Sequence, residues 1–590
     1  MPEGLLSNSP ALASLVDFFE RYFEEVYPDF FGKNATHPVL PVKRSKIIHD
    51  SVWGTNEFLW PELALIDSPV LQRLRDIHQV GLAWLVYPTA THSRFEHSLG
   101  TAVIATRTFD NLRARQGDTL ASIARTIDSR SNPEAVVSTM REELRLACLL
   151  HDSGHTLFSH TSETAHGLFP QLKQATEELS TLLSKDRSTG ETLSFCIALT
   201  PALRALVQRA SRAVYIDGSP TPQSIRVDFE NVALMIVGAS KHPYTQFLAD
   251  VVTSGFDADK LDYLLRDASA AGLPIKYDMD RYLVFVEVRP DYFSEKTSAS
   301  LGPLYGRFGV ELEGLAVEPG ARPTRLQTYR TRLPIEAVTS MEQIVICKFM
   351  LFNYIYHHSK VRAAEGMVEH ALRAEVLRRL AKEDSSRVLA WFFGLSDSDF
   401  LLIAKSRAPK PTGADPFDSM FDCAYRIANR LLPREIFHLG SSQLTHADAT
   451  QLLNFMARLQ DREQTSGIVK ELEEKIGANL LRDDPTRGSD PFDALQRACI
   501  WVDVPKPPRF EGVDELIGSS GTDGSAADVP LSTVFPIHRW AETYLNYSYE
   551  ARIFSSSEMI GPASSAAADA VALQAGISSA GCSKLRRRRL

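Results

Sequence analysis

Apolar and polar residues recur with a helical period over most of the first half of this chain. Residues 10–31 place Phe and Tyr side chains along one face of an amphipathic helix, which we expect to dock onto the body of the protein. From about residue 68 to residue 275 the apolar spacing is again helical. The pattern therefore predicts a mostly α-helical protein.

Two shorter stretches follow a pattern that is typical of strands. Residues 282–288 and 305–317 are rich in β-branched and aromatic residues and are separated by turn residues, so they predict a small sheet. A helical run returns afterwards, and we expect helices at 335–382, 416–431, 447–477 and 491–502. The fold class that follows is mostly α, with a helical core, a small β-hairpin or sheet insertion and a C-terminal helical subdomain.

Beyond residue 503 the periodic signal weakens. A Gly/Ser-rich stretch reads as a linker, aromatic residues return at 534–554, and a Ser/Ala/Gly-rich end that finishes in Lys584 and arginines 586–589 is predicted to be disordered. The boundaries that we expect are 1–45 for an N-terminal amphipathic helix and entry segment, 46–280 for the core, 281–335 for a β-rich segment, 336–510 for the C-terminal helical subdomain, 511–530 for a linker, 531–555 for a final packed element and 556–590 for a disordered, basic-ended tail.

Composition narrows the class of protein. A chain of 590 residues is too long for one compact core, and a net charge of −9 argues against a general nucleic-acid binder, although the basic end leaves such a contact open. The six cysteines have no CxxC spacing, which suggests reduced thiols. No secretory signal is visible, and no segment approaches the about 20 apolar residues of a membrane span. We therefore expect a cytoplasmic protein without a membrane partner.

Three polar motifs interrupt the apolar pattern of the predicted core: THSRFEHSLG (91–100), LLHDSGHTLFSH (149–160) and DADKLDYLLRD (257–267). They supply imidazoles and carboxylates that suit one borderline or hard divalent cation. These candidate ligands are His97, His151, Asp152 and Asp259. Their chemistry fits Mn²⁺, Fe²⁺, Zn²⁺, Ni²⁺ or Mg²⁺ without choosing among them. A metal held there could activate water and polarise a phosphoryl oxygen.

Each motif taken alone has a plainer interpretation. Single histidines scatter through any protein, and the third motif can be read as an exposed, salt-bridged helix. On a helix, however, Asp259, Lys260, Tyr263 and Asp267 share one stripe opposite a leucine face. The concentration of a base, a phenol and acids on one stripe favours a site over a solvated surface.

The order of the motifs resembles that of the HD-domain phosphohydrolases. Within this superfamily, the residues around the motifs are similar to those of the deoxynucleoside triphosphate triphosphohydrolase branch, which includes the SAM-and-HD-domain proteins. The segments that carry this similarity are IDSPVLQRLRDIHQVG, YPTATHSRFEHSLG, HDSGHTLFSH and DADKLDYLLRD. The similarity runs from about Lys46 to Asp267 and returns around residues 340–361. It implies an HD-domain helical core, a divalent metal cofactor, a nucleotide substrate and a homo-oligomer.

The resemblance also implies a residue for each role. The family's metal ligands map onto the candidate ligands above, and His155 and His160 match the histidines beside the α-phosphate, so they are the expected catalytic residues. The residues that match substrate contacts are Gln79, Val80, Arg94, Lys260, Tyr263, Asp267, Lys348 and Tyr356. A regulatory nucleotide site is matched by Lys46, Asp67, Gln72 and Arg75, for which ordinary helix-surface charge is the alternative.

The sequence departs from the family's pattern at several positions, among them the following three. The family's Thr-His-Glu motif is matched by Thr189-Gly190-Glu191, and Gly190 cannot transfer a proton; His166 is a candidate substitute at a different spacing. Where the family has a leucine in its sugar pocket, this sequence has the smaller Val80. Where the family has a phosphate-binding arginine, this sequence has Lys348, which keeps the charge but cannot form two parallel hydrogen bonds.

The leading functional expectation is a metal-dependent hydrolase that cleaves a deoxynucleoside triphosphate to the deoxynucleoside and triphosphate. A second hypothesis keeps the metal but changes the substrate to an alarmone, a nucleoside monophosphate, a cyclic dinucleotide or single-stranded nucleic acid. A third is a nucleotide-binding regulatory protein with decayed catalysis, of which Gly190 would be the mark.

Overall fold

The computed structural model describes most of the chain. The described residues are 5–36, 45–213, 227–293, 295–308, 310, 326–406, 420–440, 446–505, 516–520, 526–537, 539–540 and 550–586. As the sequence predicted, the fold is mostly α, with small sheets and an HD-type helical core.

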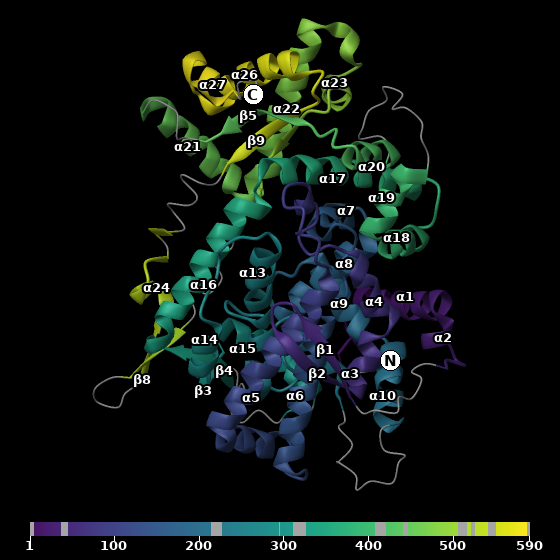
Figure 1. The fold of residues 1–590 in the computed structure, drawn as a ribbon, viewed down its shortest axis with the longest axis vertical. Coiled ribbons are helices and arrows are strands. Elements are labelled where there is room, and N and C mark those ends of the chain that lie inside the picture. The colour runs from purple at the N-terminus through teal and green to yellow at the C-terminus, as the bar shows by residue number, and fades with distance from the viewer. Residues whose placement is uncertain are drawn as a thin grey trace, which may run out of the picture.

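Two long helices, α5 (Arg94–Ile127) and α6 (Pro133–Leu150), form the centre of the core and pack against each other (Figure 1). The Glu96 side chain accepts a hydrogen bond from the backbone N–H of Ser93 (3.2 Å), which fixes where α5 begins. The last two turns of α6 are buried, so the chain leaves this helix at His151 inside the protein. A third helix, α13 (Ala258–Ala270), packs on α5 and brings the third polar motif to the same place.

Shorter helices surround this centre. They are α1 (Pro10–Val26), α2 (Pro28–Phe31), α3 (Trp60–Ile66), α4 (Pro69–Gln72), η1 (Arg73–Asp76), η2 (Ala83–Leu85), η3 (Ser159–Ser162), α7 (Glu163–His166), α8 (Pro170–Leu183), α9 (Thr189–Ala198), α10 (Pro201–Ala213), α11 (Phe229–Ile236), η4 (Pro243–Thr245), α12 (Gln246–Val252) and α14 (Met279–Phe285).

The N-terminal helix α1 docks onto the body of the protein, which confirms the prediction from its aromatic face. Phe19 and Phe23 are buried, and the Phe19 ring meets Phe393 edge-on with centroids 5.0 Å apart. The Glu178 carboxylate of α8 accepts hydrogen bonds from the free backbone N–H groups of Ala11 and Leu12 at 2.9 and 3.0 Å. A side chain from the core therefore caps this helix.

The later part of the chain first packs beside the core and then continues into a second helical region, drawn at the top of Figure 1. The helices of this later part are α15 (Glu295–Arg307), η5 (Ile335–Ala337), α16 (Val338–Leu351), the π-helical turn η6 (Phe352–Tyr356), α17 (Ser359–Leu380), α18 (Ser385–Gly394), α19 (Asp397–Ser406), α20 (Met420–Ala428), α21 (His446–Gln460), α22 (Arg462–Asp483), η8 (Pro485–Arg487), α23 (Pro491–Arg497), α24 (Leu531–Val534), α26 (Ile560–Ala575) and α27 (Ser579–Leu585). Of these, α21, α22, α23, α26 and α27 lie at the top, whereas α15, α16 and α24 lie lower in the view.

Three small sheets accompany the described helices. Strands β1 (Ser45–Asp50) and β2 (Gly54–Leu59) form an antiparallel hairpin that leads into α3. A second sheet has the order β3-β4-β7-β8, and a third has the order β5-β9-β6. Their strands are β3 (Glu287–Tyr292), β4 (Gln327–Pro334), β7 (Leu516–Ser520), β8 (Ala526–Pro530), β5 (Arg434–Leu439), β9 (Ala551–Ser555) and β6 (Trp501–Asp503).

Both predicted strands of the β-rich segment were placed wrongly. Of the first, predicted at 282–288, residues 282–285 belong to α14, and β3 begins only at Glu287. Where a strand was expected from residue 305, the chain is still in α15, because Leu301, Leu304 and Tyr305 are buried at helical spacing. The partner of β3 is instead β4, which pairs with it antiparallel. Residues 311–325, which hold most of the predicted strand, lie outside the described residues.

The linker predicted at 511–530 and the disordered tail predicted at 556–590 are also corrected. Part of the linker forms β7 and β8, which extend the β3-β4 sheet. The tail forms α26 and α27, because alanine has the highest helix propensity and its small side chains allow close packing. The alanines at 563, 566, 567 and 570 are buried at helical spacing, and α26 packs on α22.

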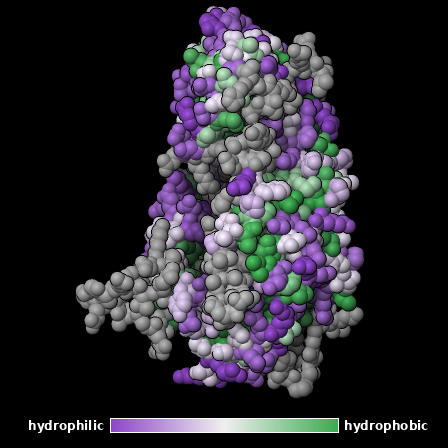
Figure 2. Space-filling view, turned by 90° about the vertical axis from the view of Figure 1, so that its left-hand side faces the viewer, coloured by the Kyte–Doolittle hydropathy of each residue, from purple (hydrophilic) through white to green (hydrophobic). Residues whose placement is uncertain are grey.

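The surface and the thiols agree with the composition. On the side drawn in Figure 2, hydrophilic residues alternate with smaller hydrophobic patches. Within the described residues, no single helix has the length and apolarity to cross a membrane; α9 and α10 pass that test only as a pair bent by 53°. All six cysteines are buried and form no disulfide, as their spacing predicted.

Candidate metal centre and active site

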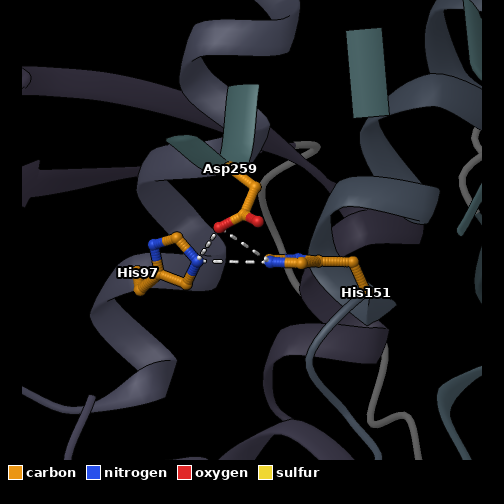
Figure 3. A group of neighbouring side chains, drawn as sticks. All are labelled: His97, His151 and Asp259. Carbon is orange, nitrogen blue, oxygen red and sulfur yellow. Dashed lines mark hydrogen bonds and ion pairs between the residues drawn. The ribbon is translucent and has the colours of Figure 1, made fainter. Parts of the chain in front are cut away.

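Three helices bring two imidazoles and a carboxylate to one point (Figure 3). His97 lies in the first turn of α5, His151 follows the last turn of α6, and Asp259 lies in the first turn of α13. The His97 Nε2 atom is 3.0 Å from Asp259 Oδ1 and 3.2 Å from His151 Nε2, and His151 Nε2 is 3.9 Å from the same oxygen. These atoms face one another across the space of a single ion.

The other ring nitrogen of each histidine is held by the protein. His151 Nδ1 lies 2.6 Å from the Cys148 carbonyl oxygen, and His97 Nδ1 lies 2.7 Å from Asp262 Oδ2. Both oxygens are acceptors, so each Nδ1 is held as a proton donor and each Nε2 atom faces the cluster. Two Nε2 atoms 3.2 Å apart need a proton or a cation beside them, and acceptors that hold Nδ1 orient metal-binding histidines in this way.

The electrostatics of His97 show the same demand for positive charge. Burial lowers the pKa of His97, but the hydrogen bonds to Asp259 and Asp262 outweigh burial and raise the pKa to about 10. The pocket therefore stabilises a proton at this point, and a divalent cation can replace that proton. The donor set fits a divalent metal on this ground as well as on geometry.

Asp152 lies on the same side of the cluster. Its Oδ1 is 3.4 Å from His151 Nε2, and its Oδ2 is 3.6 Å from His97 Nε2. The Arg94 guanidinium donates a hydrogen bond of 2.5 Å to Oδ2. Burial raises the pKa of this carboxyl, but Arg94 and the histidines beside it hold it well below its usual range, so Asp152 is a carboxylate. The structure thus brings all four predicted metal ligands together.

Asp262 orients this cluster and was missed from the sequence. It is fully buried, contacts His97 Nδ1, and accepts hydrogen bonds from the Trp53 indole N–H and from Arg266 Nε (2.7 Å). Arg266 in turn donates to Asp50 at the end of β1 (2.8 Å). The signal was available, because Asp262 and Arg266 lie four residues apart on α13 and face α5 together.

Gly100 shows how tightly α5 and α13 approach at this buried network. A Cβ at position 100 would lie well inside 3.0 Å of Asp262 Oδ1 and of Arg266 Nη2, closer than real Cβ atoms come. Only glycine allows the helices to meet here without moving that carboxylate.

His155 lies between Asp152 and Glu163. Its Nε2 is 3.4 Å from Asp152 Oδ1, and its buried Nδ1 makes no hydrogen bond within the described part of the chain. Burial, with the charge of Arg94, lowers its pKa to about 4, so the ring is neutral. His160 is largely exposed, and its Nδ1 lies 2.8 Å from Glu163 Oε1. Both predicted catalytic histidines therefore adjoin Glu163, which the sequence analysis did not name.

Gly190 lies directly beside His155. A Cβ at this position would be 3.3 Å from His155 Cε1 and 3.5 Å from Glu163 Oε1. Glycine thus leaves room for His155 and Glu163, and a longer side chain at position 190 would press against both. His166 does not take its place, because its nitrogens contact the hydroxyls of Thr189 (2.8 Å) and Thr156 (3.2 Å) inside the fold.

The residues expected around the sugar also come together. Asp267 accepts a hydrogen bond from the Tyr356 hydroxyl, and its other oxygen lies 2.8 Å from His92 Nε2. Val80 is almost buried, and the Gln79 side-chain oxygen is buried without a hydrogen-bond partner in the described structure. A buried acceptor of this kind is costly unless a ligand satisfies it.

The expected cationic residues are placed less directly. Lys260 donates hydrogen bonds to Asp257 (2.7 Å) and to the Ser254 carbonyl (2.9 Å), so its ammonium is held within its own helix N-terminus. Lys348 is half-buried on α16. Tyr263 is partly buried on α13, with Lys260 and Asp259 close enough to perturb its hydroxyl, whose pKa burial raises above its ordinary value.

The regulatory candidates form two separate pairs. Lys46 Nζ lies 2.9 Å from Asp67 Oδ2, with both side chains about half exposed. Arg75 donates to Gln72 Oε1 (2.8 Å), and its guanidinium covers the Phe95 ring at 3.8 Å. Each pair is satisfied by itself, so a nucleotide at this place stays a prediction.

Comparison with known proteins assigns the centre to a family. Residues 94–192 match the family model described as HD domain. The chain contains an HD domain. This domain holds His97, His151 and Asp152, whereas Asp259 lies beyond the matched residues.

The chain is similar to proteins from distant organisms. It is 24% identical over 335 residues to an uncharacterized protein of Methanocaldococcus jannaschii, covering 56% of this chain and 50% of that protein. It is 30% identical over 262 residues to the deoxynucleoside triphosphate triphosphohydrolase SAMHD1 of Bos taurus, covering 41% and 38%. This chain therefore spans half or less of the length of these relatives.

The fold is also similar to that of a solved structure. It is a hypothetical protein from Aquifex aeolicus, with a TM-score of 0.52 and 19% sequence identity. The match covers 88% of this chain and 99% of that one, so the architecture is similar beyond the matched domain.

Proposed function

We propose that this protein is a metal-dependent HD-type phosphohydrolase that acts on nucleotides, and that it cleaves deoxynucleoside triphosphates to the deoxynucleoside and triphosphate. One observation carries the proposal: His97, His151 and Asp259 face a single point, and each histidine is held by its Nδ1 so that Nε2 faces that point. The Asp152 carboxylate lies beside them, 3.4 Å from His151 Nε2 and 3.6 Å from His97 Nε2. A divalent cation bound there would supply Lewis-acid activation of a phosphoryl oxygen and of a water molecule.

The chain's own residues supply proton transfer and charge. His155 is within 3.4 Å of Asp152 and has an Nδ1 atom without a hydrogen bond, so it can take a proton from the attacking water or position that water. Glu163 touches both His155 and His160 and can orient either ring. Arg94 keeps Asp152 ionised and adds positive charge beside the phosphate.

The nucleoside end would be held by the second group of residues. Asp267 and Tyr356 offer a hydrogen-bonded pair for a sugar hydroxyl, and Gln79 offers its unpartnered oxygen as an acceptor. The similarity to the bovine deoxynucleoside triphosphate triphosphohydrolase supports this choice of substrate. Val80 is a smaller wall than leucine, so discrimination against a 2′-hydroxyl is expected to be weaker than a close-fitting wall would give.

The test is turnover with defined metals. The full chain is incubated with each dNTP and NTP and with Mn²⁺, Mg²⁺, Fe²⁺, Ni²⁺ or Zn²⁺, and nucleoside and triphosphate are measured by chromatography. His151→Ala should abolish turnover, whereas His438→Ala, which removes a histidine paired with Glu550 in the C-terminal region, should not. Full turnover by His151→Ala with metal present would contradict the proposal.

A second candidate function rests on Gly190. Glycine beside His155 offers no proton-transfer group, and this observation favours a nucleotide-binding regulatory protein. This alternative predicts dNTP binding in calorimetry with no product. Hydrolysis of another phosphoester in a substrate panel would instead retain the metal chemistry and replace the dNTP as substrate.

A further inference from the structure

A buried carboxylate from the C-terminal helical region lies where two walls of the candidate active site meet. Asp397 is the first residue of α19 and is fully buried. Its Oδ2 accepts hydrogen bonds from the backbone N–H (2.9 Å) and the ring Nδ1 (2.7 Å) of His78. Its Oδ1 accepts from the backbone N–H of Phe158 (2.5 Å). These partners lie 319 and 239 residues away in the sequence.

One of these walls has a backbone that needs support. Phe158 and Ser159 lie near the end of the second polar motif (149–160). Their φ angles are +50° and +56°, a left-handed conformation that is strained for residues with side chains. Such a conformation persists only where the surroundings fix it. Helix α19 supplies two contacts to Phe158: the carboxylate of Asp397 and the ring of Phe400, which meets the Phe158 ring edge-on at 5.2 Å.

The two walls are also joined to each other. The Ser159 hydroxyl donates to the His78 carbonyl (2.7 Å) and accepts from Arg94 Nε (2.7 Å). Arg94 donates in turn to the candidate metal ligand Asp152 (2.5 Å). A chain of hydrogen bonds, buried or partly buried, therefore connects Asp397 through His78 and Ser159 to Arg94 and the metal centre. The second partner of Asp397, His78, directly precedes Gln79 and Val80 of the expected nucleoside pocket.

We propose that Asp397 is a positioning residue for catalysis, which fixes the distance between the loop that carries the metal-side groups and the wall that faces the nucleoside. This inference rests on the proposed function, because it concerns the same site. It assigns to the C-terminal helical region a part in completing an active site whose metal ligands all lie before residue 260. Asp397 touches neither the metal ligands nor the substrate residues directly in the hydrogen bonds described, so its effect passes through His78, Phe158 and Ser159.

The experiment compares Asp397→Asn with Asp399→Asn in the full chain. Asparagine keeps the shape of Asp397 but turns an NH₂ group toward one of the N–H donors, so the hydrogen bonding to either His78 or Phe158 is lost. Asp399 is exposed on the same helix and accepts hydrogen bonds only from Ser396 in the described contacts (3.0 and 2.7 Å), so its variant loses a local cap and no contact to the site.

Two readouts separate positioning from general stability. With the dNTP that the wild type hydrolyses best, kcat of Asp397→Asn should fall about 100-fold, as misplacement of reacting groups by about 1 Å does. KM should stay within about threefold, because Asp267 and Tyr356 keep their contact. Amide hydrogen exchange of residues 155–162 should become faster in this variant while α5 and α6 stay protected. Asp399→Asn should match the wild type in both readouts.

If Asp397→Asn fails to fold, His78→Ala decides the question. It removes one of the hydrogen bonds to Asp397 at a partly exposed side chain, and it should accelerate exchange at 155–162 and lower kcat to a smaller extent. Unchanged exchange and unchanged kcat in a folded Asp397→Asn, or an equal loss in Asp399→Asn, would overturn the inference.

The exchange readout needs no substrate, so the two proposals can fail separately. If the wild type hydrolyses no dNTP, kcat is measured with bis(p-nitrophenyl) phosphate and Mn²⁺. Faster exchange at 155–162 with loss of that activity would then support Asp397 as a positioning residue while rejecting the dNTP as substrate.

Discussion

Replacing Gly100 by alanine tests whether the buried carboxylate Asp262 controls metal binding. The new Cβ would lie within 3.0 Å of Asp262 Oδ1, so this carboxylate has to move by about 1 Å from its place. That shift breaks the hydrogen bond from His97 Nδ1, now 2.7 Å long, and frees the ring to turn its Nε2 away from the cluster. Loss of such an orienting partner lowers metal affinity by about 10- to 100-fold.

The stability change can be worked from the same contacts. The displaced carboxylate loses its ion pair with Arg266 in a buried setting, which costs about 3–5 kcal/mol when a buried pair is broken. Alanine in a helix gains up to about 1 kcal/mol over glycine. We therefore expect Gly100→Ala to be about 2–4 kcal/mol less stable than the wild type in denaturant unfolding.

Gly117→Ala is the control in α5, placed directly after the kink at Gln116. A Cβ at position 117 would meet no atom within 4 Å, so this variant should keep wild-type metal affinity and gain between zero and about 1 kcal/mol of stability. Mn²⁺ titration by calorimetry measures the affinity of all three proteins. Wild-type Mn²⁺ affinity in a folded Gly100→Ala would refute the reasoning that Asp262 orients His97 for the metal.

Three further predictions concern the wider structure. Burial raises the pKa of Glu143 from 4.5 to about 7, so the free energy of unfolding should fall by up to about 3 kcal/mol as the pH rises from 4.5 to 7. Glu143→Gln should remove this pH dependence, which chemical unfolding at each pH measures. Tyr356→Phe loses its hydrogen bond to Asp267 and should change the ratio of kcat/KM for a dNTP over its NTP by about tenfold, which competition assays measure; an unchanged ratio would remove Tyr356 from sugar recognition. Gly154→Ala puts a Cβ within 3.0 Å of the backbone of Gly190 and Ser194, so thermal unfolding should show a loss of about 1–3 kcal/mol, and a wild-type melting temperature would contradict this close packing.

The sequence allowed the central site to be predicted because its ligands fall in short local motifs. His97 and Asp259 lie in the first turns of α5 and α13, and His151 and Asp152 directly follow α6. The helical period of the sequence indicates these helix ends, and the residue types indicate the ligands. The spacing of Asp262 and Arg266 was visible in the sequence, but only the packing of α13 on α5 brings this pair to His97, so Asp262 was missed. Asp397 could not be found at all, since its partners are 319 and 239 residues away.

The errors in the fold have a similar origin. Strands β7 and β8 exist through pairing with each other and with β4, so the polar sequence of 511–530 gives little local sign of them. In α26 the signal was present but was read as low complexity: its alanines recur at helical spacing and become a core face only when α22 lies against them. Tertiary contacts decided both segments.

The most direct test of the account is metal content in a crystal or in solution. Anomalous diffraction at the edge of the metal found by elemental analysis should show one ion per chain, in contact with His97, His151, Asp152 and Asp259, and Asp259→Asn should lower its occupancy. No ion at this point in metal-loaded wild-type protein, or an ion held elsewhere with these four side chains free of it, would contradict the central claim.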